Sequence, residues 1–148
     1  MNPPPLLIAG AFVLLSVALW IAILVLGARY GGWSALARQY LGPDTIAGDV
    51  CTYANARFRW FYGYNRCLTI TISQQGVHMR PMFAYRLHHP PLLIPWEAVI
   101  QMQNKSVALF PRADVIIRST DPAAPFTIGF KGKRLVETLF RHWPGPSG

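Results

Sequence analysis

The chain has 148 residues, enough for one domain of ordinary size but not for two. Its formal net charge is +8, and every charged side chain lies at or after Arg29, so the basic character belongs to the C-terminal part alone. Because the sequence has no lysine–arginine run, helix-turn-helix signature or RNP-like motif, this charge favours anionic lipid headgroups or an acidic protein surface over nucleic acid.

The first predicted element is a transmembrane helix over residues 6–28, preceded by a short extracytoplasmic N-terminus at residues 1–5. The segment reads LLIAGAFVLLSVALWIAILVLGA and carries no charge. At about 1.5 Å per residue it spans roughly 34 Å, which is enough to cross the hydrocarbon core of a bilayer. A cleaved signal peptide has a basic start and a shorter apolar run, so the sequence favours a retained anchor.

Residues 29–46 are expected to form an interfacial segment and linker. Basic side chains follow the apolar run and none precede it, so the positive-inside rule places the C-terminal domain in the cytoplasm and the N-terminus outside. Tyrosine and tryptophan rings prefer the headgroup layer, and residues 33–40 are expected to form a short interfacial helix. The residues expected at the membrane interface are Arg29, Tyr30, Trp33, Arg38 and Tyr40.

After Pro43 the hydrophobic pattern changes to a period of two residues, which indicates strands. Leu68, Ile70 and Ile72 alternate with hydroxyl residues, and a turn at 74–76 leads to a return strand. The strands predicted from the alternation are 68–73, 77–81, 92–96, 99–103, 107–110, 114–118 and 126–130.

The final predicted element is an amphipathic helix over residues 133–143. Its apolar stripe includes Leu135, Leu139 and Phe140, and Pro144 ends it. The two cysteines flank a hairpin that is expected to turn near Gly63, a register that keeps them apart, so we expect two free thiols.

This order resembles the pleckstrin-homology-like fold, in which a C-terminal helix caps a bent antiparallel sheet. The resemblance covers about residues 47–143, with 144–148 as a tail, and is carried by Gly76-Val77 followed by PLLIPWEAVI at residues 91–100. The chain also looks like small bacterial membrane proteins with one helix ahead of such a domain. The resemblance implies a bacterial inner-membrane protein: one transmembrane α-helix plus a mostly-β (α+β) domain that binds a ligand the fold does not name.

The sequence offers no catalytic motif and no implied cofactor. Its six carboxylates form no motif pair, and no acid or cysteine stands at metal-ligand spacing from the tandem His88-His89. We therefore expect a protein that is not an enzyme and that holds no metal. A small enzyme using His88, His89 and Glu97 is the weakest alternative.

Two aromatic and basic stretches are the candidate binding sites. The first reads RFRWFYGYNR at residues 57–66, and in pleckstrin-homology-like domains the loop joining the first two strands contacts lipid. The second is the loop 82–89. The candidate residues for partner or lipid binding are Arg57, Arg59, Trp60, Tyr62, Arg66, Arg80, Phe83, Tyr85 and Arg86. The alternatives are a strand with solvated arginines for the first and a loop folded under its own domain for the second.

These features lead to two functional hypotheses. The first is a non-catalytic accessory or scaffold subunit of a bacterial respiratory, photosynthetic or transport complex. In it the helix packs on partner helices and the basic domain covers their cytoplasmic face. The second is a stand-alone, membrane-anchored pleckstrin-homology-like module that binds anionic lipid or an acidic protein.

Overall fold

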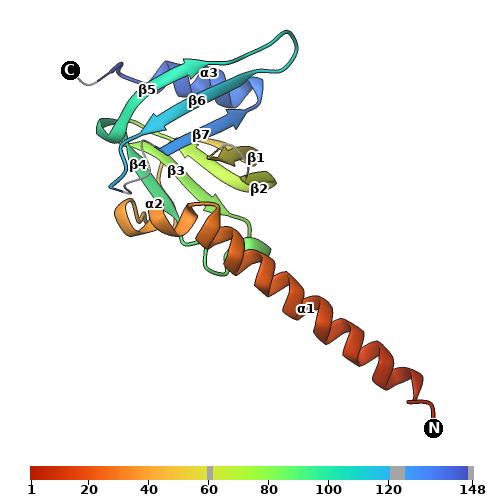
Figure 1. Ribbon diagram of the computed structural model, residues 1–148. Coiled ribbons are helices and arrows are strands. Elements are labelled where there is room, and N and C mark those ends of the chain that lie inside the picture. The colour runs from red at the N-terminus through yellow and green to blue at the C-terminus, as the bar shows by residue number, and fades with distance from the viewer. Residues whose placement is uncertain (60–61, 121–125, 147–148) are drawn as a thin grey trace.

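A long helix extends from a curved antiparallel sheet, and a short helix lies at each end of that sheet (Figure 1). The computed structural model describes residues 1–59, 62–120 and 126–146. The helices are α1 (Pro5–Tyr30), α2 (Trp33–Gln39) and α3 (Lys133–His142), with short 3₁₀ turns η1 (Phe83–Tyr85) and η2 (Trp96–Ala98). The strands are β1 (Asp49–Phe58), β2 (Tyr62–Ile72), β3 (Gly76–Pro81), β4 (Leu92–Pro95), β5 (Val99–Asn104), β6 (Arg112–Ile117) and β7 (Phe126–Lys131).

Helix α1 is long and apolar enough to span a membrane. It begins at Pro5, whose fixed φ suits the first turn of a helix. All side chains from Leu6 to Ile23 are exposed, and the polar one, Ser16, donates its hydroxyl hydrogen to the carbonyl of Phe12 within the helix. The long apolar helix predicted at 6–28 is confirmed and extends slightly beyond both predicted ends.

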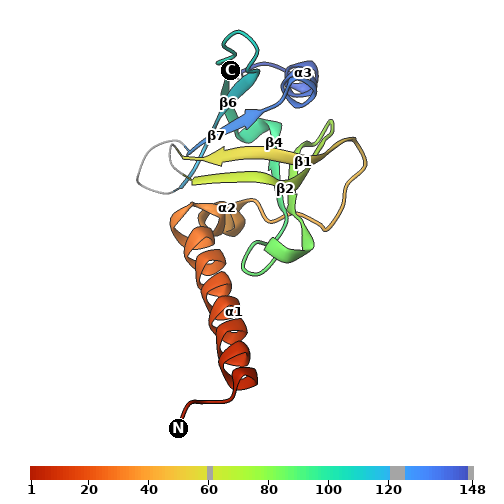
Figure 2. The ribbon, with the colours of Figure 1, turned by 90° about the vertical axis from the view of Figure 1, so that its right-hand side faces the viewer.

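The described strands form one antiparallel sheet in the order β4-β3-β2-β1-β7-β6-β5. β1 is central, with β2 on one side and β7 on the other. Its register with β2 shifts twice between Cys51 and Ala56, and Tyr53 at the first shift has a φ of 51°. Irregularities of this kind bend a strand and increase its twist. The sheet can therefore curl until it is nearly closed (Figures 1 and 2).

The predicted fold class is confirmed: an apolar helix precedes a mostly-β domain that ends in a helix. The arrangement is compatible with the pleckstrin-homology-like fold. Two local predictions are wrong. Gly63 lies within β2, paired with Arg57, and not at the turn of the first hairpin. Residues 107–110 form the turn of the β5–β6 hairpin and not a strand. Both cysteines are free, as expected.

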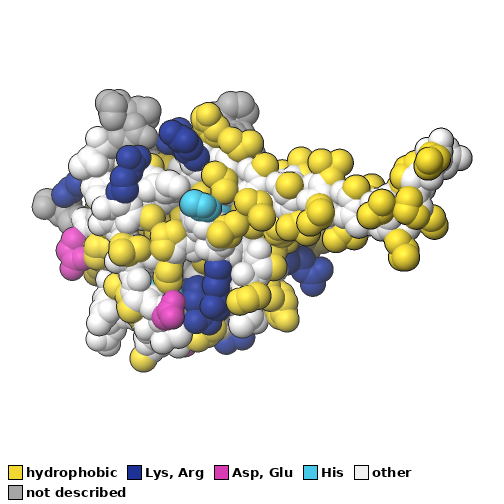
Figure 3. All heavy atoms as spheres, turned by 90° about the horizontal axis from the view of Figure 1, so that it is seen from below, with side chains coloured by type: hydrophobic (Ala, Val, Ile, Leu, Met, Phe, Trp, Pro, Cys, Tyr) yellow, Lys and Arg dark blue, Asp and Glu magenta, His cyan; other side chains and the backbone are white. Residues whose placement is uncertain are grey.

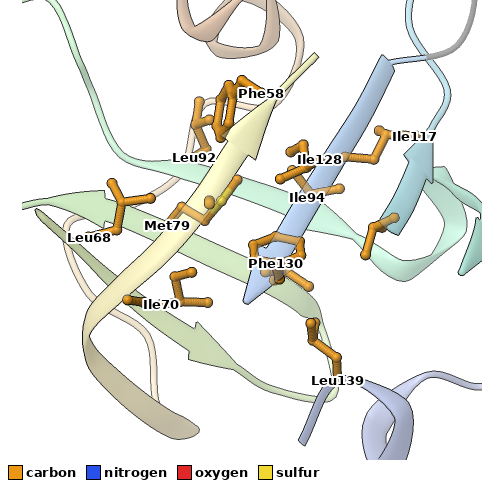
Figure 4. Close-up of a cluster of buried hydrophobic side chains, with 14 of the residues drawn as sticks. Phe58, Leu68, Ile70, Met79, Leu92, Ile94, Ile117, Ile128, Phe130 and Leu139 are labelled. Atoms are coloured by element: carbon orange, nitrogen blue, oxygen red, sulfur yellow. The ribbon is translucent and has the colours of Figure 1, made fainter. Parts of the chain in front are cut away.

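The core fills the inside of the curved sheet, and every described strand contributes buried side chains to it. Figure 4 shows part of this core. Figure 4 labels Phe58, Leu68, Ile70, Met79, Leu92, Ile94, Ile117, Ile128, Phe130 and Leu139, all of which are almost completely buried. Burial of each such side chain contributes about 1.5–3 kcal/mol to the free energy of unfolding.

A short helix closes each end of the sheet. At one end, α2 follows a bend at Gly32, whose φ of 95° glycine adopts without strain. Trp33 opens α2, is fully buried and stacks on Phe58 with 5.1 Å between ring centroids. At the other end, Leu135 and Leu139 of α3 are buried against the sheet, which confirms the predicted amphipathic stripe.

Replacing Leu139 with aspartate tests the docking of α3. The substitution places a carboxylate in the seam between α3 and the sheet, so we expect the free energy of unfolding to fall by about 4 kcal/mol. Urea unfolding of the detergent-solubilised protein, followed by tryptophan fluorescence, measures the change. Glu137→Gln on the exposed face of the same helix is the control and should shift stability by no more than about 0.5 kcal/mol. Equal stability of the two variants would show that α3 is not docked in this way.

Candidate functional site

Helix α1 meets the domain near its C-terminal end, where Gly27 and the C-cap residue Gly31 face Tyr62. A Cβ added at Gly27 would overlap the hydroxyl group of Tyr62, and one added at Gly31 would come within 2.8 Å of its ring. The two glycines are four residues apart and share one face of the helix. Tyr62, predicted to bind a partner, instead lies half-buried between α1 and the sheet.

Trp33 is the centre of an aromatic cluster at the same end of the domain. Besides stacking on Phe58, its ring meets Tyr64 and His89 edge-on, at centroid distances of 5.2 and 5.3 Å. Its indole N–H donates a hydrogen bond of 2.8 Å to the carbonyl of Pro90. A fully buried indole does not face lipid headgroups, so the placement of Trp33 at the membrane interface is wrong.

The other residues predicted at the membrane interface lie around this junction. Arg29, Tyr30 and Arg38 are exposed, so their side chains are available to headgroups. Tyr40 is half-buried, and its hydroxyl donates to the carbonyl of Arg118. The segment expected as a linker thus contributes both to the core and to the surface beside α1.

Both ring nitrogens of His89 have hydrogen-bond partners in this cluster. Its Nδ1 lies 2.9 Å from the carbonyl oxygen of Leu87, so Nδ1 carries the hydrogen. Its Nε2 then accepts a 2.9 Å hydrogen bond from the hydroxyl of Tyr64. Burial lowers the pKa of His89 from the ordinary value of 6.5, and burial also raises the pKa of the Tyr64 phenol. The domain therefore favours an uncharged histidine at this position.

The predicted arginines are distributed over several parts of the domain. The Arg59 guanidinium lies 5.4 Å from the ring centre of Phe126, a cation–π contact. Arg80 donates at 3.3 Å to a backbone carbonyl in the segment before β1. Arg66 is exposed on β2. Trp60 lies outside the described residues.

The tip of the β5–β6 hairpin carries an exposed apolar cluster. Val107, Leu109 and Phe110 are 70%, 89% and 77% exposed. They line a hollow of about 470 Å³ together with basic side chains. We name as the hairpin surface the six residues Val107, Leu109, Phe110, Arg57, Lys105 and Lys131.

The charge of the hairpin surface has one sign. At its edge, Arg112 is neutralised by Asp114 through two hydrogen bonds of 2.9 and 3.2 Å. Within the described residues, no carboxylate pairs with Arg57, Lys105 or Lys131. Of these six residues the sequence predicted only Arg57. The sequence signal for this surface is the apolar run at residues 107–110, which precedes Pro111, is flanked by basic residues and lies in a hairpin turn.

The loop 82–89 lies beside α1 in both ribbon views (Figures 1 and 2). Tyr85 meets Trp20 of α1 edge-on, with 5.2 Å between ring centroids. Phe83 is 86% exposed, and the Arg86 guanidinium lies 6.0 Å from its ring centre. One side of the loop therefore packs on α1 while its tip stays uncovered by the molecule.

Across residues 1–59, 62–120 and 126–146, no three histidine, cysteine or acidic side chains come together as metal ligands. Both ring nitrogens of His89 are hydrogen-bonded, whereas His88 and Glu97 are exposed. Comparisons with protein-family models, with curated proteins and with solved structures find no match to this chain.

The neutral state of His89 predicts a pH-dependent stability. Because the pKa of His89 is lowered by folding, the unfolded chain binds the proton more readily. Stability is therefore complete above pH 6.5 and is lost as the pH falls below it. We expect the melting temperature to drop between pH 7.5 and pH 5.5, and to drop less in His89→Gln. His88→Gln removes only the smallest contribution to the lowered pKa of His89 and should keep most of the wild-type drop, measured by thermal unfolding. An unchanged pH dependence in His89→Gln would contradict the assignment.

Proposed function

We propose that this chain is a non-catalytic accessory or scaffold subunit of a bacterial inner-membrane complex. In this proposal α1 spans the membrane and packs on partner helices. A pleckstrin-homology-like domain stands on the cytoplasmic side and docks on an acidic, partly apolar protein surface. The stand-alone lipid-binding module is the alternative.

The hairpin surface is the observation that carries the proposal. Three large apolar side chains at a hairpin tip find no cover in their own domain, and three basic groups flank them. Apolar anchors with a polar rim are typical of protein–protein interfaces, and the rim charges select the partner. The hairpin lies with α3 at the end of the domain opposite α2 (Figures 1 and 2). A protein reaching over the domain fits this position better than the lipid around α1 does.

The double variant Leu109→Asp and Phe110→Asp tests docking at the hairpin surface. Loss of such anchors costs an interface about 2 kcal/mol or more, which is roughly a 30-fold loss of affinity. We expect the partners that co-purify with the tagged chain in mild detergent to be lost, as measured by quantitative mass spectrometry. The control Val50→Asp places one aspartate on an exposed valine outside this surface, and this variant should keep the partners. A wild-type chain that migrates alone, as a small species, would favour the lipid-binding module.

A second test concerns the orientation of the chain. Reporters fused after Gly148 should be active if they require the cytoplasm and inactive if they require the periplasm, since the basic residues follow α1. Green fluorescent protein and alkaline phosphatase fusions measure the two compartments. Phosphatase activity would contradict the proposed orientation and with it the cytoplasmic docking partner.

A further inference from the structure

The contact between loop 82–89 and α1 fixes the height of the domain along the helix. Tyr85 meets α1 at Trp20, well before the helix ends at Tyr30. Tyr62 meets the same helix at Gly27 and beyond. The underside of the domain therefore runs along α1 from Trp20 to the end of the helix at Tyr30.

The free part of α1 is too short to span a bilayer alone. From Pro5 to Leu19 the helix rises roughly 22 Å at 1.5 Å per residue. A hydrocarbon core is about 30 Å thick, which leaves about 8 Å to be covered by the part of α1 that lies beside the loop. Keeping the loop above the bilayer would require the bilayer to thin by that amount, at an energetic cost for each ångström.

The exposed side chains of the loop suit the boundary between headgroups and acyl chains. Phe83 and Leu87 are 86% and 45% exposed, and Arg86 is exposed beside Phe83. Apolar side chains can enter the acyl region while an arginine reaches back to the phosphates. Figure 3 shows the apolar surface of α1 continuing onto the adjoining face of the domain, with basic side chains around it.

Hydrogen bonds within the loop satisfy part of its backbone, as a layer poor in water requires. The N–H of Tyr85 donates to Met82 at 2.8 Å, that of Arg86 to Phe83 at 3.3 Å. The N–H of His89 then donates to Arg86 at 3.0 Å. Consecutive turns thus satisfy backbone groups that an open loop would expose at a cost in lipid.

We propose that loop 82–89 inserts into the lipid beside α1, as a second membrane contact at the boundary of headgroups and acyl chains. The inference rests on the part of the proposed function in which α1 spans the bilayer. It does not depend on the protein partner. Because Tyr85 contacts Trp20 of α1, the lipid that surrounds α1 also surrounds the loop.

An environment-sensitive fluorophore on the full-length protein tests the insertion. In a Cys51→Ser background, Phe83→Cys is labelled with nitrobenzoxadiazole and the chain is reconstituted in vesicles of phosphatidylcholine and phosphatidylglycerol. Leu87→Cys provides a second position in the loop. Leu109→Cys on the hairpin is the matched control, since it is as exposed as Phe83. The Cys51→Ser protein without an added cysteine shows how much label the buried Cys67 takes up, and this signal is subtracted.

We expect blue-shifted emission at positions 83 and 87, quenching by lipids with a nitroxide near the headgroup, and protection from iodide. Position 109 should show water-like emission and open quenching by iodide. Water-like emission at 83 and 87 from a chain that resists alkaline extraction would overturn the loop insertion alone. Release of the chain by alkaline extraction would overturn the insertion and the membrane anchor together. Protection of the loop in native membranes but not in these vesicles would assign it to a protein partner and overturn the lipid contact.

Discussion

The burial of one indole, that of Trp33, ties the helical part of the molecule to the sheet. The ring stacks on Phe58, meets Tyr64 and His89 edge-on, and donates its N–H to a backbone carbonyl. It closes the end of the curved sheet that α3 leaves open. Since Trp33 follows α1 after a two-residue bend, the same contact determines where α1 leaves the domain.

The end of the domain that is attached to α1 and the end that carries α3 differ in their exposed side chains. The end at α1 carries the aromatic junction and the loop beside Trp20, and its exposed side chains include Phe83, Arg86 and Leu87. The end at α3 carries the hairpin surface, where apolar side chains lie next to unpaired cations among the described residues. In the two proposals one end meets lipid and the other meets an acidic protein, and the sheet lies between the two ends.

The sequence predicted those elements whose pattern repeats over many residues. Three such patterns are the apolar run of α1, the stripe of Leu135 and Leu139 in α3 and the alternation in β2. Each places one face, or all, of an element in a single environment, so its periodicity is enough to predict the element. The register of β1 was not predictable because it depends on bulges, and nothing in the local sequence marks Tyr53 for its positive φ of 51°.

Interactions between distant segments account for the other errors. A tryptophan that follows an apolar helix can lie in the headgroup layer or in a protein core. The contacts of Trp33 with Phe58 and Pro90, which lie far along the chain, place it in the core. Tyr62 likewise could lie at a binding surface or inside the protein, and its contact with α1 leaves it half-buried. Arg57 and Phe83, which composition singled out as candidates, also belong to the two surfaces for which binding is proposed. The hairpin tip was missed because a short apolar run beside Pro111 also satisfies the pattern of a strand.

The Gly31-Gly32 bend has a mechanical consequence. No flexible linker separates α1 from the sheet, because the residue after the bend is part of the core. A single helix adjusts its tilt to the thickness of the surrounding bilayer. Any such rotation passes undivided into the domain, which acts as a lever arm: a small angular change at the helix becomes a sweep of the hairpin tip at the far end.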